Sequence, residues 1–496
     1  MLGLSKARTV VRLFNSKCDW IIRDGQYFQL CRRSFSTGFC SRQQTVGYGS
    51  SIVSPTRAVG NEAAASTNAD AVADYSNVFK YKSTAELLRA IFVFKLCTYQ
   101  IFVKNSLWVM NSSRRLLGRR LFDRLMKVTF YGQFVAGETR AELLASSSSL
   151  LKAGVRPILC VPIEEDKGAN VSEAAVYERN FRMVMECVRT SPEVCKDVPV
   201  AQLKLTAVVP GRLCGILSEQ VTCPAKHYEL LEKIRGYMDG EPVDLGFLEA
   251  GDQRALEAAL SRVRDICRLS EELGVLLLID AEYTDLNPAL RLISLAAMLK
   301  FNKKRPLVAY TYQNYLKKCY SELVEDVEFT ARQGACFAAK VVRGAYMQSE
   351  RRLATEKGHE DPVHENFEAT TAMYHRSADF LLDRAVATPD RICFIIASHN
   401  EGTLNYVNRR LGELGVPPGG RAVLFGQLYG MADHLSAKLA QSGHLVYKSV
   451  PYGPVDETLP YLQRRAVENS SLLGGTGQER RILWTALKQR LSHLQQ

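Results

Sequence analysis

Residues 274–282, GVLLLIDAE, form an apolar run that stops at two acidic side chains, and residues 288–304, PALRLISLAAMLKFNKK, follow with helical spacing. A short continuous apolar run is typical of a strand that is buried on both faces of a parallel sheet. Seven further runs have the same texture: PILCVPI (157–163), AQLKLTAVV (201–209), PLVAYTY (306–312), CFAAKVVRGA (336–345), RICFIIASHN (391–400), RAVLFGQLYG (421–430) and HLVYKSVPYG (444–453). Eight strand–helix units in series predict an α/β fold, a TIM-like (β/α)8 barrel over residues 151–472.

Helical segments flank and interrupt the predicted barrel. The long gap between the second and third runs predicts a helical insertion near 225–265, and we expect an N-terminal helical region over 81–150 and a C-terminal helical tail over 473–496. The apolar segment 83–110 is broken by Lys95 and Lys104, so it falls short of the ~20 residues that span a bilayer. A packing helix is the favoured interpretation of this segment, and a helix lying in the membrane interface is the alternative.

The first 43 residues differ from the rest of the chain in charge. They contain eight basic and two acidic side chains, with an apolar face in VVRLF (10–14), and RSFS (33–36) resembles a matrix-processing site. These features predict a mitochondrial transit peptide over 1–43, in preference to a disordered basic tail. Residues 44–80 include a stretch rich in Ser, Ala, Gly and Asn, which predicts a linker.

Composition excludes several classes of protein. With 46% hydrophobic and 23% charged residues, the chain is not collagen-like, of low complexity or mostly disordered. Its 13 cysteines include no Cys-x-x-Cys pair, which disfavours a secreted disulfide framework and a structural zinc module. Half of the net charge of +12 lies in the first 43 residues, so we expect no nucleic-acid partner. The eight histidines form no strand-end ligand set, so we expect no metal, which disfavours a metal-dependent barrel hydrolase.

Polar side chains gather where the predicted strands stop. The active site of a (β/α)8 barrel lies at the carboxyl ends of its strands. In chain order, the ends of the second to seventh predicted strands carry Lys204 and Thr206, Asp280 and Glu282, Tyr310 to Gln313, Arg343 to Tyr346, Ser398 to Asn400, and Gln427 to Gly430. After the last strand, Arg464 and Arg465 could hold a carboxylate and Glu468 could brace one of them. An exposed helix face with an ordinary ion pair is the alternative for that sequence.

Several motifs in order resemble the proline dehydrogenase family, in particular its stand-alone mitochondrial members from eukaryotes. The resemblance runs from about residue 120 to 472 and is carried by TFYGQFVAGE (129–138), LKLTA (203–207), IDAE (279–282), AYTYQNYLK (309–317), AKVVRGAYM (339–347), ASHN (397–400), GQLYGMAD (426–433) and VPYGPVDETLPYLQRRAVENSS (450–471). It implies a distorted barrel with non-covalent FAD. The implied reaction oxidises L-proline to 1-pyrroline-5-carboxylate, the first step of proline catabolism to glutamate. Electrons would pass to ubiquinone, and the enzyme would be peripheral on the matrix side of the inner mitochondrial membrane.

The resemblance also implies roles for individual residues. Lys204, Arg464 and Arg465 would hold the substrate carboxylate, and Glu468 would orient the arginines. Asp280 would act electrostatically by pairing with Lys204. The implied catalytic set is thus Asp280, Lys204, Arg464, Arg465 and Glu468, and the implied substrate contacts add Tyr346, Leu428, Ser449 and Tyr461. The implied FAD contacts are Ala281, Tyr310, Lys340, Val342, Gly344, Ala345, Ser398, His399 and Gln427. Lys340 or Arg343 would place a cation near the flavin, and Gly344 would let the backbone approach it closely.

Three positions depart from the family pattern. Ser449 stands where proline-specific members carry a tyrosine that packs on the proline ring, and it resembles the branch that prefers hydroxyproline. Lys340 stands where bacterial members often carry Arg, and Phe367 where some carry a phosphate-binding Lys, so phosphate contacts would come from elsewhere, such as a helix N-terminus. We expect L-proline as the physiological substrate with activity on both amino acids. The alternatives are a trans-4-hydroxy-L-proline dehydrogenase and a non-catalytic mitochondrial barrel.

Overall fold

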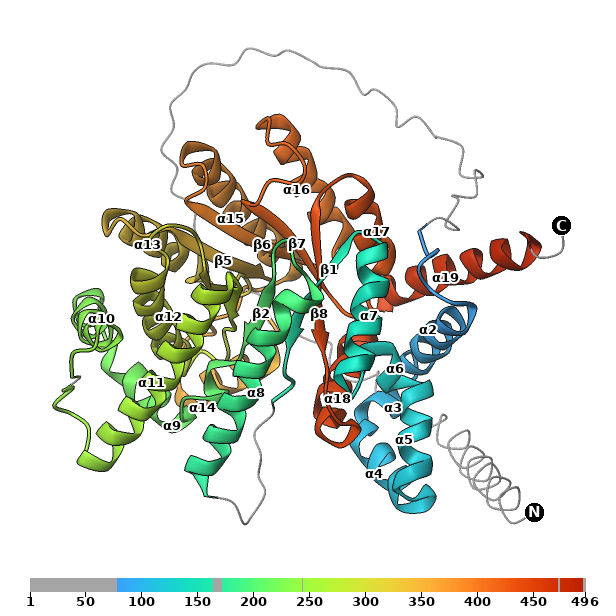
Figure 1. Cartoon of the computed structure of the whole chain (residues 1–496), viewed down its shortest axis with the longest axis horizontal. Coiled ribbons are helices and arrows are strands. Elements are labelled where there is room, and N and C mark those ends of the chain that lie inside the picture. The colour runs from blue at the N-terminus through green and yellow to red at the C-terminus, as the bar shows by residue number, and fades with distance from the viewer. Residues whose placement is uncertain (1–77, 164–171, 243, 472, 494–496) are drawn as a thin grey trace, which may run out of the picture. The chain divides into compact units, whose positions relative to one another are not determined.

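Eight parallel strands close into a barrel in the computed structural model, which describes residues 78–163, 172–242, 244–471 and 473–493 (Figure 1). Each strand pairs with the next one along the chain, and the last pairs with the first. The strands are β1 (Val155–Cys160), β2 (Val200–Leu203), β3 (Leu276–Ile279), β4 (Val308–Gln313), β5 (Phe337–Val342), β6 (Ile392–Ala397), β7 (Val423–Leu428) and β8 (Leu445–Pro451). All eight predicted strands and the barrel are therefore confirmed.

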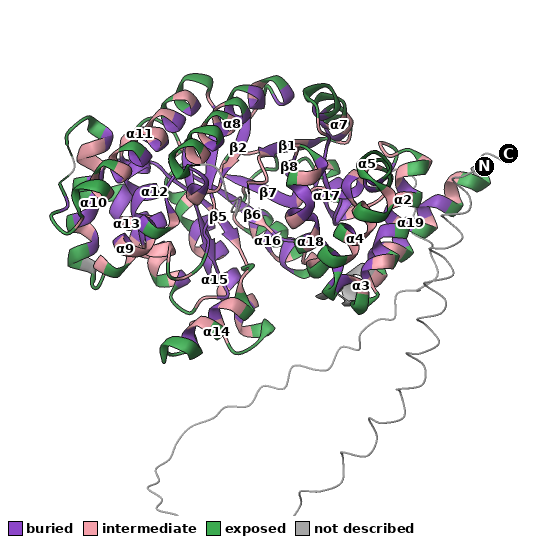
Figure 2. Ribbon diagram, turned by 90° about the horizontal axis from the view of Figure 1, so that it is seen from below, coloured by how far each residue is buried: buried purple, intermediate pink, exposed green. Residues whose placement is uncertain are grey.

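Alternate residues of each strand point to opposite sides of the barrel wall. One set fills the interior: Ile158, Val200, Leu276, Leu278, Ala309, Ala338, Cys393, Ile395, Leu424, Leu445 and Tyr447 pack together. The other set packs outward against the helices in a larger core. Both faces of the strands are buried, which explains why their sequences are continuously apolar (Figure 2).

Helices surround the barrel, and extra helices separate β2 from β3. The surrounding helices include α7 (Arg140–Lys152), α8 (Glu173–Val194), α12 (Asn287–Phe301), α13 (Cys319–Arg332), α14 (Met347–Lys357), α15 (Phe367–Ala387), α16 (Glu401–Glu413) and α17 (Asp433–Gln441). Between β2 and β3 lie a 3-10 turn (Leu205–Ala207), α9 (Gly211–Gln220), α10 (Pro224–Asp239) and α11 (Ala250–Leu273). The predicted helical insertion is confirmed.

The N-terminal helices form a second core with the last two helices of the chain. They are α2 (Thr84–Cys97), α3 (Gln100–Lys104), α4 (Ser106–Leu117), α5 (Arg119–Val128) and α6 (Phe130–Phe134), and they pack with α18 (Val455–Ser471) and α19 (Leu473–His493). A capping box in which Ser83 and Glu86 bond each other's backbone amides starts α2. Figures 1 and 2 show these helices gathered beside one end of the barrel.

Some predictions lie outside the described residues. The predicted transit peptide (1–43) and residues 44–77 of the predicted linker are among them, so both stay predictions, as do the other domain boundaries. Within the described ranges, no helix is long and apolar enough to cross a membrane.

Candidate functional site

A chain of polar side chains crosses the barrel interior at the carboxyl ends of the strands. Lys340 on β5 forms an ion pair with Asp280, which follows β3. Gln202 on β2 donates through Nε2 to Asp280 Oδ2 at 2.5 Å, and Ser449 Oγ on β8 donates to Gln202 Oε1 at 3.0 Å. Cys160 Sγ on β1 lies 3.6 Å from Ser449 Oγ. These positions continue the interior-facing alternation of their strands, so the chain forms the uppermost layer of the barrel interior.

The predicted pairing of Asp280 with Lys204 is wrong. Lys204 follows β2 at the start of the 3-10 turn, and its Nζ lies 3.5 Å from Glu282 Oε2 instead. Glu282 also accepts from the Thr206 hydroxyl at 2.8 Å. Burial raises the pKa of the Glu282 carboxyl, against the opposing effects of Lys204 and Thr206. The aspartate faces the barrel axis, where Lys340 reaches it, whereas Lys204 lies outside the end of its strand.

Helix α18 contributes a buried arginine with unfilled donors. Arg465 is 6% exposed, and its Nη2 lies 2.7 Å from Glu468 Oε1. Its guanidinium lies over the Tyr461 ring, 4.9 Å from the ring centre. Arg465 Nε and Nη1 and the Tyr461 hydroxyl are buried without hydrogen-bond partners. The expected bracing of the arginine pair by Glu468 is therefore seen at Arg465, while Arg464 is exposed.

The same helix packs against the end of β7. Leu428 packs on the core that contains Tyr461 and Leu462.

Burial raises the pKa of the Cys160 thiol to about 11, and the charges of Asp280, Lys340 and Arg465 also act on it. The charge of Arg465 therefore acts on the Cys160 thiol at the end of the interior chain.

Tyr346 joins this site from the loop after β5. Burial raises the pKa of its phenol, and the charges of Arg464, Glu282 and Asp280 act on it. Its ring packs on that of Tyr283, with 4.4 Å between ring centres.

Gly344 lies against the ring of Tyr315. It has φ of +143°, and a Cβ at this position would lie 1.5 Å from the Tyr315 ring. Side chains larger than hydrogen are therefore excluded by the Tyr315 ring, and the close approach of Gly344 to a flavin stays a prediction. Gly344 and Ala345 are exposed, and Val342 is half-buried at the end of β5.

His399 and Ser398, after β6, are held by their neighbours. His399 Nε2 accepts from the Leu428 backbone N–H at 2.9 Å, and burial lowers the pKa of the imidazole to about 3. The neutral ring therefore carries its proton on Nδ1 and can donate from there. Ser398 Oγ accepts from the Asn400 N–H at 3.1 Å. Gln427 points outward, and its amide bonds the Ser398 carbonyl and the Ser436 hydroxyl.

Arg343 is a half-buried cation that donates its hydrogen bonds to uncharged side chains. Its nitrogens donate to the hydroxyls of Thr371 and Thr403 at 2.9 and 3.0 Å, and its guanidinium lies over the Phe367 ring. Arg343 Nε is buried without a partner, and burial lowers the pKa of the guanidinium. Thr403 lies in the first turn of α16, so the arginine points to a helix N-terminus.

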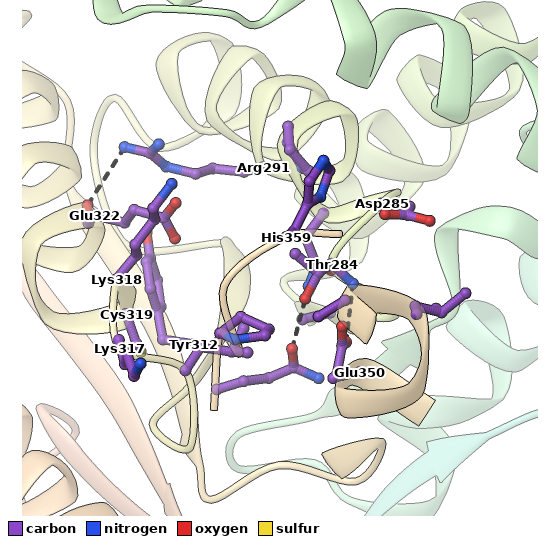
Figure 3. Close-up of a pocket in the computed structure, with 18 of the residues that line it drawn as sticks. Thr284, Asp285, Arg291, Tyr312, Lys317, Lys318, Cys319, Glu322, Glu350 and His359 are labelled. Atoms are coloured by element: carbon purple, nitrogen blue, oxygen red, sulfur yellow. Dashed lines mark hydrogen bonds between the residues drawn. The ribbon is translucent and has the colours of Figure 1, made fainter. Parts of the chain in front are cut away.

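A cavity of about 500 Å3 lies behind β4, between α12, α13 and α14 (Figure 3). Ala281 and Tyr310 line it together with Arg291, Glu322 and Glu350. Tyr310 packs in the outer core rather than in the interior of the barrel. Its side chain therefore lies apart from the chain of Asp280, Gln202 and Ser449, although it was expected at the same cofactor site.

Sequence reasoning missed Gln202 and the role of Glu282. Gln202 stands in the middle of an apolar strand, two residues before Lys204, so an interior polar position could have been read from the strand alternation. Its bond to Ser449 joins strands whose residues are 247 positions apart, and no local pattern encodes that contact. No group of three or more His, Cys, Asp or Glu residues in the described part of the chain is placed to hold a metal ion.

Comparison with known proteins identifies the family of this chain. A family model described as proline dehydrogenase matches residues 165–478. This chain belongs to the proline dehydrogenase family. It is accordingly an oxidoreductase, and the resemblance seen in the motifs is confirmed.

Relatives within the proline dehydrogenase family differ in the substrate that they are named for. The chain is 42% identical to a hydroxyproline dehydrogenase of Xenopus laevis, covering 86% of this chain and 92% of that protein. It is 40% identical to the human hydroxyproline dehydrogenase, with 83% and 92% covered. Identity to human proline dehydrogenase 1, mitochondrial, is 32%, with 84% and 90% covered.

The fold also matches part of a longer chain of known structure. Proline utilization A from Bdellovibrio bacteriovorus, in a structure inactivated by N-propargylglycine, aligns with a TM-score of 0.56 and 19% identity. The alignment covers 80% of this chain but 37% of that one. At this identity the likeness establishes the barrel fold alone.

Proposed function

We propose that this chain oxidises trans-4-hydroxy-L-proline at C5, the CH2 carbon bonded to the ring nitrogen, with FAD as oxidant. The observation that carries the proposal is the Ser449 hydroxyl, held in the barrel interior by Gln202. The higher identity to proteins named hydroxyproline dehydrogenase supports the same choice. The product would be the corresponding hydroxylated pyrroline carboxylate, formed by loss of one hydride and one proton as a C=N bond replaces the C–N bond.

The hydrogen-bond chain fixes which way Ser449 faces. A carboxylate paired with an ammonium group only accepts hydrogen bonds, so Asp280 takes the Gln202 NH2 and turns the Gln202 oxygen toward Ser449. Ser449 has one proton and gives it to that oxygen. Its remaining capacity is to accept. A substrate hydroxyl can donate to it, whereas the CH2 group of proline cannot, so this geometry favours the hydroxylated ring.

The carboxylate end of the substrate would be held by α18. Arg465 Nε and Nη1 and the Tyr461 hydroxyl are buried donors that lack acceptors. An amino-acid carboxylate offers two oxygens in the fork geometry that a guanidinium matches. Arg464 and Lys204 would add positive charge at the rim, and Glu468 would hold Arg465 in place. A small substrate held at both ends has its reacting carbon positioned without further contacts.

The residues present fit FAD at one informative point. Arg343 is a half-buried cation beside the first turn of α16. Its buried Nε has no hydrogen-bond partner, and its other nitrogens donate to threonine hydroxyls. This combination suits a diphosphate, which supplies the missing acceptor and charge. His399 Nδ1 and Lys340 would contact the rest of the cofactor, together with Val342, Ala345 and Ser398. FAD supplies the two-electron oxidant that accepts the substrate hydride.

L-proline is the second candidate substrate. The chain is 32% identical to human proline dehydrogenase 1, mitochondrial, and Lys204, Asp280, Arg464 and Arg465 would serve either amino acid. We also propose a mitochondrial location and a membrane quinone as the electron acceptor, supported by the names of these relatives and by the motif resemblance.

The test is a purified protein with a flavin spectrum. Anaerobic addition of trans-4-hydroxy-L-proline should bleach the visible flavin bands, and L-proline should do so with lower kcat/KM. A protein that holds no flavin even after reconstitution with FAD would overturn the proposal. So would a flavin spectrum that neither amino acid bleaches.

A further inference from the structure

The N-terminal helices carry a concentration of exposed apolar side chains. Ten of the 21 exposed large hydrophobic residues in the described part of the chain lie between Leu88 and Val128. Leu116 is 70% exposed, Trp108 68% and Val128 65%. Single exposed apolar residues are ordinary, but such a concentration marks an interaction surface.

Helix α5 shows how this surface is built. At about 100° per residue, Leu121, Leu125 and Val128 form one stripe along the helix, and they are 52%, 42% and 65% exposed. Phe122 and Met126 form the neighbouring stripe and are buried in the bundle. The apolar surface of α5 therefore extends well beyond the part that the described residues cover.

Basic side chains flank the apolar stripes. On α5, Arg120 and Arg124 lie next to the exposed apolar stripe, on the side away from the buried Phe122 and Met126. On α4, Arg115 lies two turns after Trp108 on the same face of the helix. All three arginines are exposed, and none forms an ion pair with a described residue. Residues 84–128 contain nine basic and two acidic side chains. The segment is therefore complementary to an anionic surface.

The helices that carry this surface also touch the helix of the substrate site. Arg114 on α4 and Arg119 on α5 lie 3.0 and 3.4 Å from Asp456 in the first turn of α18. Figure 1 shows α3, α4 and α5 beside α18. A partner that bound α4 and α5 would therefore lie next to the helix that carries Arg465.

We propose that the α4–α5 surface, defined by Trp108, Leu121, Leu125, Arg115, Arg120 and Arg124, docks on a bilayer containing anionic lipid. A lipid interface accepts apolar side chains and arginines at the same time, and no described helix is suited to cross it. An exposed tryptophan beside arginines is typical of the headgroup region. The inference rests on the proposed function in one respect. If the electron acceptor is a membrane quinone, docking on the bilayer would bring that quinone close to the substrate site.

The test is flotation of the full chain with phosphatidylcholine vesicles that contain or lack an anionic phospholipid. The wild type should bind the anionic vesicles strongly. Arg115→Gln/Arg120→Gln/Arg124→Gln should weaken that binding by ~100-fold, since each basic residue near such a surface contributes about a fivefold effect. Trp108→Ser/Leu121→Ser/Leu125→Ser should abolish it.

Matched controls remove the same charge and the same kind of apolar group elsewhere. Lys303→Gln/Lys304→Gln/Arg332→Gln and Phe247→Ser/Leu273→Ser/Val386→Ser change exposed residues around the barrel and should bind like the wild type. An equal loss of vesicle binding in the control and test variants would contradict the proposed docking surface. A wild type that does not bind vesicles but self-associates through these residues would also contradict it.

Turnover with a soluble dye acceptor keeps the two proposals separate. The α4–α5 variants should retain it, because none of the changed residues belongs to the substrate site. Absent dye turnover with intact vesicle binding would count against the proposed reaction, and normal dye turnover with absent vesicle binding would count against the surface.

Discussion

Ser449 on β8 donates a hydrogen bond to Gln202 on β2 across the mouth of the barrel, at 3.0 Å. Gln202 in turn donates to Asp280, which is paired with Lys340. The ion pair therefore decides the direction of every hydrogen bond up to Ser449, and Ser449 is left as an acceptor for the substrate. Substrate preference in this account depends on two residues, one of which does not touch the substrate.

Gln202→Leu should lower kcat/KM for trans-4-hydroxy-L-proline about tenfold more than for L-proline. Leucine keeps the volume but removes the acceptor that orients Ser449, and mispaired buried polar groups cost ~1–3 kcal/mol. Steady-state kinetics on both amino acids measures the ratio. The control is the same change in a Ser449→Ala background, where it should leave the ratio unaltered. An equal loss on both substrates in the wild-type background would mean that Gln202 has only a structural role.

Arg465→Met should raise KM sharply, because truncation leaves the buried substrate carboxylate without its charged partner. The fall in kcat/KM should correspond to a loss of ~2–5 kcal/mol in the free energy of transition-state binding. Arg464→Met should cost less, since Arg464 is exposed whereas Arg465 is 6% exposed. The ratio of flavin to protein absorbance checks that both variants keep FAD. A normal KM for Arg465→Met would contradict the role given to this helix.

Asp433→Asn should destabilise the fold without any change at the substrate site. Asp433 lies 2.8 Å from Lys82 and 2.9 Å from Lys448, whose side chain is 1% exposed. Burial favours the protonated acid, but Lys448 and Lys82 outweigh it and hold the pKa of Asp433 well below its ordinary range. At neutral pH the full contribution is present. Removing the charge leaves the buried Lys448 and the largely buried Lys82 without their carboxylate, and it should lower the free energy of chemical unfolding by ~3–5 kcal/mol. Asp239→Asn, at the exposed pair with Lys300, should cost under ~1 kcal/mol. Similar losses at the two positions would refute the argument.

Acidification should weaken the fold partly through His399. Burial, with Lys448 and Arg465, lowers the pKa of this histidine to about 3, from an ordinary value near 6.5. Between these values the unfolded chain binds a proton that the folded chain does not, so stability falls as the pH falls. Between pH 7 and 5 the wild type should lose about 2 kcal/mol more than His399→Gln. His359→Gln, at an exposed ring, is the control, and an unchanged pH dependence in His399→Gln would show that the ring charges freely in the folded protein.

Much of the architecture could be predicted from the sequence because strand burial on both faces leaves a local signal. The eight apolar runs and the helical insertion all appear where they were expected. The motif on α18 likewise predicted the pairing of Arg465 with Glu468, since both lie within one helical turn.

Contacts between strands could not be predicted in the same way. Asp280 was expected beside Lys204, but the interior alternation turns it toward Lys340, and Lys204 meets Glu282. The side chain of Tyr310, a predicted cofactor contact, faces outward from β4 into the outer core. Gln202 was not considered at all, because its two partners come from other strands. Such contacts depend on barrel closure and on the register of paired strands, which single-sequence patterns do not specify.

The central claim, that Ser449 accepts a hydrogen bond from the substrate's hydroxyl, is tested most directly by Ser449→Tyr. The tyrosine ring would fill the space that the hydroxyl needs and add contact area for an unsubstituted ring, so kcat/KM should fall for trans-4-hydroxy-L-proline and rise for L-proline, each by ~10–200-fold at most. Steady-state kinetics of the wild type and the variant with both amino acids, under matched flavin content, gives the four values of kcat/KM. The account predicts changes of opposite sign. A change by the same factor for both substrates would contradict it.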